Sequence, residues 1–428
     1  MYLSRFRVKN YKCLADVDIP LTPIHVLIGP NDAGKTSLLE TISAFYNSAT
    51  EDLASVFPQP WDGRELVLHG SAEPHVFLRG EWGDSGSVGE SGVTAPLSYE
   101  FLVVFPTSGN RCTSKNELIT DAPIRDLVTT VIGPVDASGT LLRQGKRQGR
   151  PGVRTRLGAA LDQVLRVLRS AQIYAFDPRV MRVPAAIDPQ RKFRLDRDGF
   201  GLSTTLLDIQ GHEPDLFLNL RTEFCRLFGH FKNIRVRTEN AIDRKRVHAL
   251  EKLVPPGVAY GYAPGVGAAI YFETRAGNEL RAHQVSDGVM LILGFLALAH
   301  LPEPPSVVLI EEPENGIYPK TLEDVIRLLK ELAYRTNERP FPQIILTTHS
   351  PYVLSFFAPE EVTFLSRDPQ KPEAGVRARP LRDAPNIRER LAGGEFYLGE
   401  LWYNLTEEEL FGEPAEQRGP GGLRRGED

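Results

Sequence analysis

The feature that most constrains the fold is a glycine-rich loop, GPNDAGKTS, at residues 29–37. It follows the segment 24–28, IHVLI, an almost continuous apolar run that is typical of a strand buried on both faces of a parallel sheet. It precedes a segment in which Leu38, Ile42 and Phe45 share one face of a helix. The order of strand, G-x-x-x-x-G-K-[ST] loop and helix predicts a phosphate-binding site in an α/β fold.

Each residue type in this loop has a physical reason. Glycines at both ends let the backbone curl so that its N–H groups face phosphate oxygens, and the helix that begins at Gly34 adds its positive dipole end. We expect Lys35 to reach the β- and γ-phosphates and the Thr36 hydroxyl to bind Mg²⁺. The alternative is a strand-to-helix turn with an incidental lysine. The nucleotide-binding residues predicted in the loop are Gly29, Asn31, Asp32, Ala33, Gly34, Lys35, Thr36 and Ser37.

Two further apolar runs, SVVLI at 306–310 and QIILT at 343–347, predict two more buried strands of the same sheet. The segment 319–336 between them has apolar residues at helical spacing, so the three elements form a βαβ unit. Glu311 and Glu312 follow the first of these strands directly. We expect Glu311 to hold the magnesium and Glu312 to polarise the attacking water, on opposite faces if the strand continues through both. An acidic turn that caps the strand is the alternative.

Two smaller features complete the pattern. His349 follows the strand at 343–347, and ligands bind at the carboxyl ends of strands in open α/β sheets. Ser286 has the position of an N-cap, with Gly288 in the first turn of an apolar helix, where exposed N–H groups attract an anion. Alone, each of these two features is as readily structural as functional.

Composition excludes several classes of protein. The 428 residues allow two or three domains, and 41% hydrophobic with 25% charged residues is typical of a globular chain. The 3 cysteines lie far apart, so neither a disulfide framework nor a zinc site is indicated, and a reducing compartment is expected. The longest apolar run, 290–299, is about half of the ~20 residues that a membrane-spanning helix needs. The first residues lack the apolar region of a secretory signal, so we expect a cytoplasmic protein without a membrane partner.

The formal charge of -5 conceals a strong asymmetry along the chain. Residues 137–250 contain 22 Lys and Arg against 11 Asp and Glu, so this stretch is basic and the remainder is acidic. Such clustering is the electrostatic pattern expected of a protein that binds the nucleic-acid backbone, and the alternative is a solvated Gly/Arg loop. The densest part contains Arg143, Lys146, Arg147, Arg150, Arg154 and Arg156.

Together these motifs resemble the ABC-type ATPase superfamily, in the branch of the SMC, RecF and OLD-like proteins. RFRVKNYKCLADVDIPL and HVLIGPNDAGKTSLLE are similar to the start of that branch and its Walker A motif. QVSDGVM resembles the signature motif, IEEPENGIYP the Walker B motif with the D-loop, and TTHSPYVL the switch-histidine segment. The resemblance covers residues 1–46 and 278–357.

The resemblance implies an α/β P-loop NTPase core, an ABC-type head, with an antiparallel β subdomain and an inserted α+β lobe. On this interpretation residues 1–50 and 266–410 form the core, 51–265 form the insertion, and 411–428 form a disordered tail.

The family mechanism implies ATP held between two heads, and therefore a homodimer or a higher homo-oligomer. Ser286 and Gly288 of one copy would contact the nucleotide of the other copy. Glu312 would be the general base and His349 would sense the γ-phosphate. Lys35, Glu312 and His349 are therefore the predicted catalytic residues, Thr36 and Glu311 the predicted metal ligands, and ATP and Mg²⁺ the predicted cofactors.

Some positions depart from the family pattern. Asp32 stands where many relatives have Gly, Glu311 where Asp is more usual, and Tyr318 where transporter-type D-loops have Asp. Only 79 residues follow His349, and no long coiled coil is indicated, so we expect any accompanying nuclease on another chain. The glutamine-loop residue stays open among five candidates, which are Gln144, Gln148, Gln172, Gln190 and Gln210.

Two functions agree with these patterns. One is a DNA-associated, ATP-hydrolysing switch of bacterial genome maintenance or antiphage defence. The other is an ATP-dependent oligomeric scaffold that recruits a separate effector protein without binding DNA, with the aromatic segment 394–405, GEFYLGELWYNL, as a partner surface. A transporter subunit is disfavoured because it rarely needs an insertion of about 200 residues within its core.

Overall fold

A computed structural model describes most of the chain. The described residues are 1–83, 97–109, 112–120, 164–188 without 166 and 169, 192–240, 266–334 without 316 and 318, 342–367, 375–392 and 397–411 without 406. The chain divides into two compact units. The first unit comprises Met1–Val167 with Thr347–Asp428, and the second comprises Leu168–Leu346. The basic run 143–156, most of the helix expected near 157–168 and the tail 412–428 lie outside the described residues.

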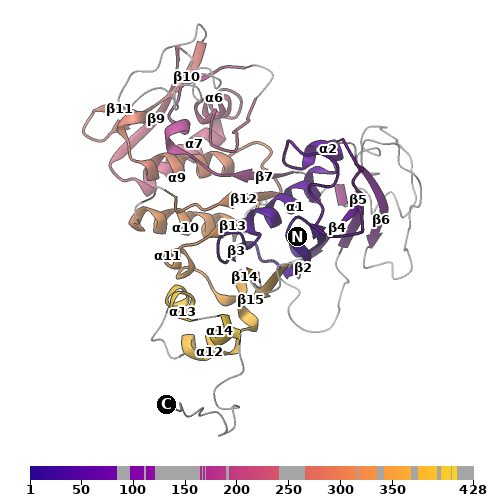
Figure 1. The fold of residues 1–428 in the computed structure, drawn as a ribbon. Helices are drawn as coiled ribbons and strands as arrows, with labels where there is room; N and C mark the ends of the chain where they lie inside the picture. Colours follow the sequence, from indigo (N-terminus) through magenta and orange to yellow (C-terminus); the bar gives the residue numbers. More distant parts are fainter. Residues whose placement is uncertain are drawn as a thin grey trace, which may run out of the picture. The chain divides into compact units, whose positions relative to one another are not determined.

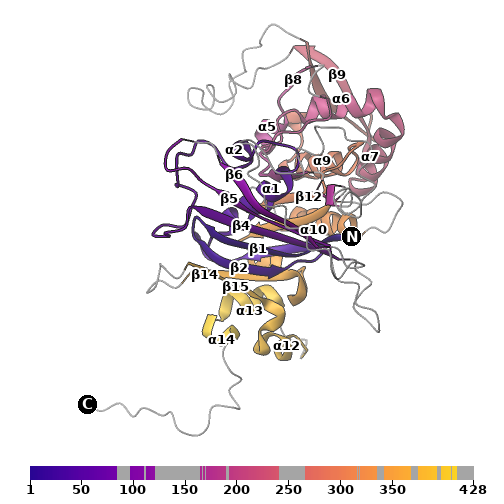
Figure 2. The same cartoon turned by 90° about the vertical axis from the view of Figure 1, so that its right-hand side faces the viewer.

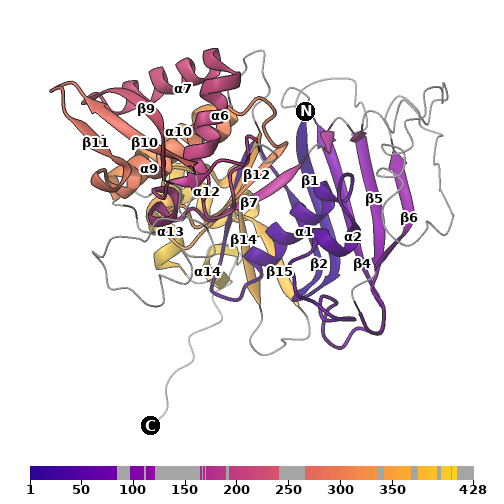
Figure 3. The ribbon, with the colours of Figure 1, turned by 90° about the horizontal axis from the view of Figure 1, so that it is seen from above.

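An antiparallel sheet forms one layer of the first unit (Figure 3). Its alternating pattern is the one predicted for the N-terminal strands, since Phe6 and Val8 are buried while Arg5 and Arg7 form ion pairs with aspartates of the next strand. The sheet also includes residues 75–120, so it continues beyond residue 50. In spatial order the strands are β2 (Leu14–Pro20), β1 (Tyr2–Tyr11), β4 (His75–Gly83), β5 (Leu97–Val104) and β6 (Thr113–Thr120).

Helix α1 (Lys35–Asn47) packs on this sheet with aromatic side chains, foremost that of Phe45. The Phe45 ring contacts the rings of Phe6, Trp82 and Phe101 at centroid distances of 5.5 to 5.9 Å. A Cβ at Gly80 would lie 2.6 Å from the Phe45 ring, so glycine at this strand position makes room for it. A short helix, α2 (Leu53–Val56), follows α1 along the chain. The packing of α1 fixes the direction in which the preceding glycine-rich loop enters its helix.

The α/β part of the fold contributes the strands β15-β14-β3 in the first unit and β13-β12-β7 in the second unit, in that spatial order. In the first unit β14 runs parallel to β3 and antiparallel to β15, and in the second unit β12 runs parallel to β7. The three strands predicted from apolar runs, β3, β12 and β13, are almost entirely buried, as expected. This confirms the predicted α/β fold. The strands are β15 (Val376–Pro380), β14 (Val362–Arg367), β3 (Ile24–Ile28), β13 (Gln343–Thr348), β12 (Val307–Glu311) and β7 (Ala171–Tyr174).

Short helices complete the described part of the first unit. Helix α13 (Leu398–Asn404) packs against α11 (Pro351–Leu354) so closely that a Cβ at Gly399 would lie 1.7 Å from the Pro351 carbonyl oxygen. Within the aromatic segment singled out above, Tyr397 and Tyr403 are 67% and 76% exposed. Helices α12 (Pro385–Ala392) and α14 (Glu407–Phe411) lie on either side of α13 in sequence.

The second unit contains an antiparallel sheet and a group of helices (Figures 1 and 2). In this sheet β10 (Val266–Thr274) pairs with β9 (Phe231–Asn240), β11 (Glu279–Arg281) and β8 (Ala185–Ala186). Helix α9 (Asp287–Ala299) is buried along almost its whole length. No described helix is both long and apolar enough to cross a membrane. The helices that contact α9 are α5 (Pro178–Met181), α6 (Leu202–His212), α7 (Pro214–Leu227) and α10 (Pro319–Ala333).

Candidate nucleotide-binding site

The loop after β3 has the backbone that a phosphate-binding loop requires. Gly29, Asp32 and Gly34 have φ values of 149°, 62° and 83°, in the range that favours glycine. A Cβ at Gly29 would lie 2.1 Å from the carbonyl oxygen of Leu365 in β14. A Cβ at Gly34 would lie 2.9 to 3.1 Å from three side chains, the nearest being the Cys13 thiol. Both glycines are therefore required by conformation and by space.

Lys35 lies within this loop. Its Nζ donates hydrogen bonds to the carbonyl oxygens of Gly29 at 3.0 Å and Pro30 at 2.9 Å, and the residue is only 7% exposed. A buried ammonium held by carbonyl oxygens of a glycine-rich loop suits an anionic group at the same place. Thr36 is exposed at the start of α1, where its hydroxyl is accessible to a metal ion. Lys35 and Thr36 are therefore placed as a site for a nucleoside triphosphate and magnesium would require.

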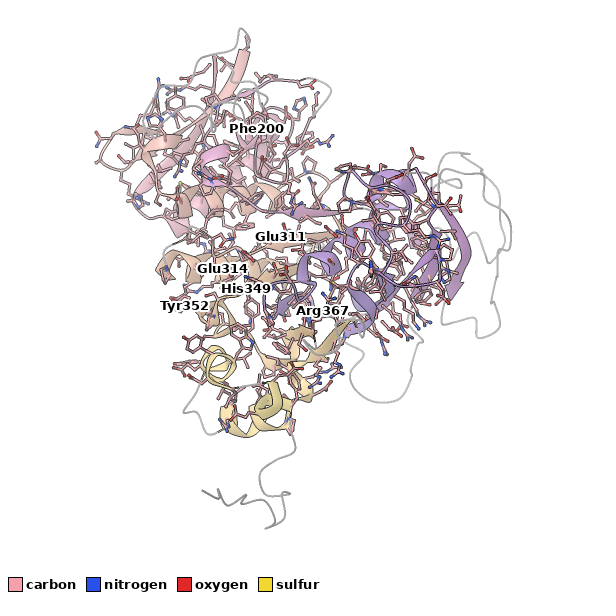
Figure 4. The ribbon with its side chains drawn as sticks, viewed as in Figure 1. Phe200, Glu311, Glu314, His349, Tyr352 and Arg367 are labelled. Carbon is pink, nitrogen blue, oxygen red and sulfur yellow. The ribbon has the colours of Figure 1, made fainter. Side chains whose placement is uncertain are left out.

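The switch-histidine segment lies in the same unit as the loop. His349 is half-buried and follows β13 directly (Figure 4). The backbone that follows His349 is held in a turn, since the Ser350 N–H donates a hydrogen bond to Thr348 Oγ1 at 2.9 Å. Ser350 Oγ in turn accepts a bond from the Val353 N–H at 3.4 Å at the start of α11. This turn holds His349 at the carboxyl end of the strand, as the sequence predicted.

The two glutamates lie in the second unit and differ in backbone conformation. Glu311 is the last residue of β12, and its carboxylate accepts a hydrogen bond from Arg197. Glu312 has a φ of 43°, so the strand does not continue through it. The expected alternation of the two side chains along one strand is therefore not realised, because the left-handed backbone at Glu312 starts a turn. In this turn Asn315 Nδ2 donates to Glu312 Oε2 at 2.8 Å.

The signature segment precedes α9, also in the second unit. The helix begins at Asp287 with Ser286 as the N-cap residue, as predicted, although the Ser286 side chain forms no capping bond. Ser286 is exposed, and Gly288 is buried in the first turn. Arg182 supports this segment, because its guanidinium donates to the carbonyl oxygens of Val285 at 2.8 Å and Ala282 at 3.1 Å. The same guanidinium forms an ion pair with Asp287 at 2.6 Å.

Gln172 is already committed to structural hydrogen bonds. Its amide nitrogen donates to the Leu195 carbonyl oxygen at 3.1 Å, and its amide oxygen accepts from the Tyr174 hydroxyl at 3.0 Å. Gln210 lies in α6. The other three glutamine candidates, Gln144, Gln148 and Gln190, lie outside the described residues. The glutamine-loop assignment therefore stays open.

Three side-chain contacts of the predicted site residues could not be predicted from the sequence. Arg197 at Glu311, Asn315 at Glu312 and Arg182 at the signature segment are ordinary polar residues until folding brings them to their partners. Within the described ranges, no group of three or more His, Cys, Asp or Glu side chains could hold a metal by itself. A magnesium site built from one hydroxyl, one carboxylate and substrate phosphates does not need such a group.

Comparison with known proteins supports this picture. Residues 1–82 match the family model described as "AAA ATPase domain", and residues 182–355 match the one described as "AAA domain, putative AbiEii toxin, Type IV TA system". A curated relative, the OLD nuclease of Thermus scotoductus, is 25% identical over 421 residues, which cover 92% of this chain and 68% of the relative.

Solved structures of SMC head domains are also similar. An SMC head bound to the C-terminal winged-helix domain of ScpA has a TM-score of 0.49 at 13% identity, over 88% of this chain and 97% of that one. The SMC head domain from Thermotoga maritima has a TM-score of 0.42 at 13% identity, over 89% and 99%. Similarity at this level decides nothing about function. The two family matches and the curated relative bear out the resemblance predicted from the motifs, since they relate this chain to AAA-type ATPases and to an OLD nuclease, and they support ATP hydrolase activity.

Proposed function

We propose that the protein binds ATP with Mg²⁺ and uses its hydrolysis as a switch, in which two heads associate around the nucleotide and separate afterwards. The loop at 29–37 carries the proposal most directly. Its two required glycines and the buried Lys35, whose ammonium is bound by loop carbonyls, form a site that favours a triphosphate.

Each of the predicted site residues has its own role in hydrolysis. Lys35 binds the β- and γ-phosphate oxygens, and Thr36 and Glu311 are the protein ligands of the magnesium, which when bound neutralises charge on the phosphates. Glu312 accepts the proton of the attacking water, while Asn315 holds its carboxylate in one orientation. His349 donates a hydrogen bond to the γ-phosphate. Loss of that phosphate removes the contacts that bridge the two copies.

Head association requires the signature segment of a second copy. We propose that Ser286 and the N-terminal turn of α9 of one copy meet the γ-phosphate held by the other. The support is local: Ser286 and Asp287 are exposed at the start of α9, and the Arg182 guanidinium donates hydrogen bonds to the carbonyl oxygens of the preceding backbone.

The biological setting that we propose is DNA-associated, in bacterial genome maintenance or antiphage defence. The excess of basic residues between 137 and 250 favours a polyanionic partner. The similarity to an OLD nuclease agrees with a nucleic-acid context. A nuclease or another effector on a separate chain would then be the partner that the switch controls.

Two variants test the enzymatic part. Lys35→Ala should lose nucleotide binding, because it removes the cation at the centre of the loop, and with it hydrolysis. Glu312→Gln should keep ATP binding but reduce the hydrolysis rate by at least about a hundredfold, and should accumulate as an ATP-dependent dimer on size measurement. Hydrolysis at the wild-type rate in either variant, measured with Arg327→Ala as a surface control, contradicts the site.

The second candidate is a scaffold that recruits an effector without binding DNA. It is favoured by the exposed aromatic side chains of the first unit, Tyr352, Tyr397 and Tyr403, on α11 and α13. Copurification of a partner that is lost in Tyr397→Ala/Tyr403→Ala, together with no DNA binding by the wild type, would select this function.

A further inference from the structure

An open, basic surface cavity lies on the second unit, and its residues are distant in sequence from the two glutamates and the signature segment. It has a volume of about 470 Å³ and is lined by residues of α7, the start of β9 and the turn after β10. Four of its lining side chains are cationic: Arg221, Arg226, Lys232 and Arg275. None of the lining side chains is a carboxylate or an aromatic ring.

The four cations are only partly neutralised. Arg226 pairs with Glu331 at 3.4 Å, and Lys232 pairs with Glu273 at 3.3 Å. Glu273 is shared, because Arg235 also binds it at 2.8 Å. The cationic side chains of these pairs are 48 to 66% exposed, so each pair contributes little energy and can open to another anion.

Arg221 and Arg275 have no acidic partner among the described residues. Arg221 Nη1 donates to the side-chain oxygen of Asn233 at 3.3 Å, and Arg275 Nε donates to the Gly229 carbonyl oxygen at 2.6 Å. Each bond uses one N–H of a guanidinium group that carries five, so the remaining donors can bind an anion. The bonds themselves keep both guanidinium groups beside the cavity.

The chemistry of the lining identifies the ligand class. Guanidinium groups match the geometry of phosphate oxygens and bind them in a bidentate manner. Without an aromatic lining residue the cavity offers no platform on which a base could stack, so recognition would be of the backbone and independent of sequence. Several cations around one hollow suit successive phosphates better than a single anion.

We propose that this cavity binds the phosphates of a nucleic-acid backbone. The proposal rests on the DNA association proposed above and locates it on α7, β9 and the turn at Arg275. In this proposal Arg221 and Arg275 make the main contacts with the phosphates. Arg226 and Lys232 leave their carboxylate partners as the phosphates approach.

The test compares two double variants with equal loss of charge. Arg221→Ala/Arg275→Ala removes the two cations without acidic partners. The control, Arg237→Ala/Arg327→Ala, removes two arginines of the same unit that already have carboxylate partners, Glu279 and Glu323. Binding of a short DNA duplex is measured by fluorescence anisotropy over a series of salt concentrations, and retained ATP hydrolysis shows that each variant is folded.

We expect the cavity variant to bind at least about tenfold more weakly than the control and to reduce the salt slope of binding by about two, because each phosphate contact contributes about 0.9 to that slope on duplex DNA. Equal binding by both double variants overturns the cavity while leaving DNA association in place. No DNA binding by the wild type overturns the DNA association and the cavity together.

Cys225 provides a second measurement, because it lines the same cavity. Burial raises the pKa of its thiol, so alkylation by N-ethylmaleimide is followed at mildly alkaline pH by mass spectrometry of its peptide. DNA should slow the labelling of Cys225 but not of Cys13. Inorganic phosphate at the same phosphate concentration should protect much less. Protection by inorganic phosphate with none by DNA contradicts the proposal.

Discussion

Asn315 donates its side-chain amide to the carboxylate of Glu312 at 2.8 Å, and the backbone N–H of Asn315 donates to the Glu312 carbonyl oxygen at 3.0 Å. These two bonds close a turn around a residue whose φ is 43°. The general base proposed here is therefore oriented by the residue three positions later in the chain.

Replacing Asn315 should impair catalysis more than binding. In Asn315→Ala the Glu312 carboxylate loses one donor, so kcat should fall by on the order of tenfold while KM changes by less than about twofold. Steady-state kinetics measures both constants, and a kcat equal to that of the wild type would contradict a positioning role.

Gly34 and Gly70 form a matched pair for testing the loop. Their φ values are 83° and 85°, but a Cβ at Gly34 would meet Cys13, whereas one at Gly70 meets nothing within 4 Å. Gly70→Ala should cost only the backbone strain, about 1 kcal/mol in the free energy of unfolding. Gly34→Ala should cost more and should weaken nucleotide binding by at least about tenfold. Denaturant unfolding and nucleotide titration of both variants measure the difference, and equal effects would mean that the space at Gly34 is unimportant.

Arg182 should control head association without affecting the phosphate-binding loop. It bonds two carbonyl oxygens of the signature segment and the Asp287 carboxylate, and its side chain is 16% exposed. We expect Arg182→Ala to weaken ATP-dependent dimerisation of the Glu312→Gln protein by on the order of tenfold, with nucleotide binding retained. Arg179→Ala is the control, because that side chain is 77% exposed and pairs with Asp177 beside it. Dimerisation unchanged by Arg182→Ala would remove the segment from the interface.

The ion pair between Arg197 and Glu311 should compete with magnesium. Because Arg197 binds the carboxylate predicted to hold the metal, the pair must open before Glu311 can act as a ligand. Arg197→Ala should therefore lower, by several-fold, the Mg²⁺ concentration that gives half-maximal binding of a fluorescent ATP analogue. A higher requirement for Mg²⁺ would show instead that Arg197 assists the site.

The buried His25 should make the free energy of unfolding depend on pH. Burial lowers its pKa to about 3, and its Nε2 lies 2.9 Å from Thr363 Oγ1. Between that value and the unfolded pKa of about 6.5, the unfolded chain binds the proton and the folded chain does not, so stability falls as pH falls. The loss attributable to His25 between pH 7 and 5 is about 2 kcal/mol. Urea unfolding of the wild type and His25→Asn at both pH values should show a smaller pH dependence in the variant.

The sequence predicted the parts of the fold that depend on local pattern. Continuous apolar runs indicated β3, β12 and β13, and helical spacing indicated α10. The glycine positions of the loop were predictable because the G-x-x-x-x-G-K-[ST] spacing itself encodes the backbone conformation found at Gly29 and Gly34.

Contacts between distant residues were not predictable in this way. Nothing near Arg275 in the sequence indicates that it joins Arg221 at one cavity, 54 positions away along the chain, and nothing near Arg197 indicates Glu311. The turn at Glu312 was not predictable, because the apolar run before it does not indicate at which of the two glutamates the strand ends. These features follow from tertiary packing, which composition and periodicity do not encode.

The bond between His25 and Thr363 joins residues that are 338 positions apart, and Gly29 packs on the carbonyl of Leu365 in the same late strand. During translation, the glycine-rich loop therefore leaves the ribosome long before the strand that supports it. A nascent chain cannot be expected to capture nucleotide until β14 has emerged. Premature termination before that strand should therefore yield products that do not bind the nucleotide.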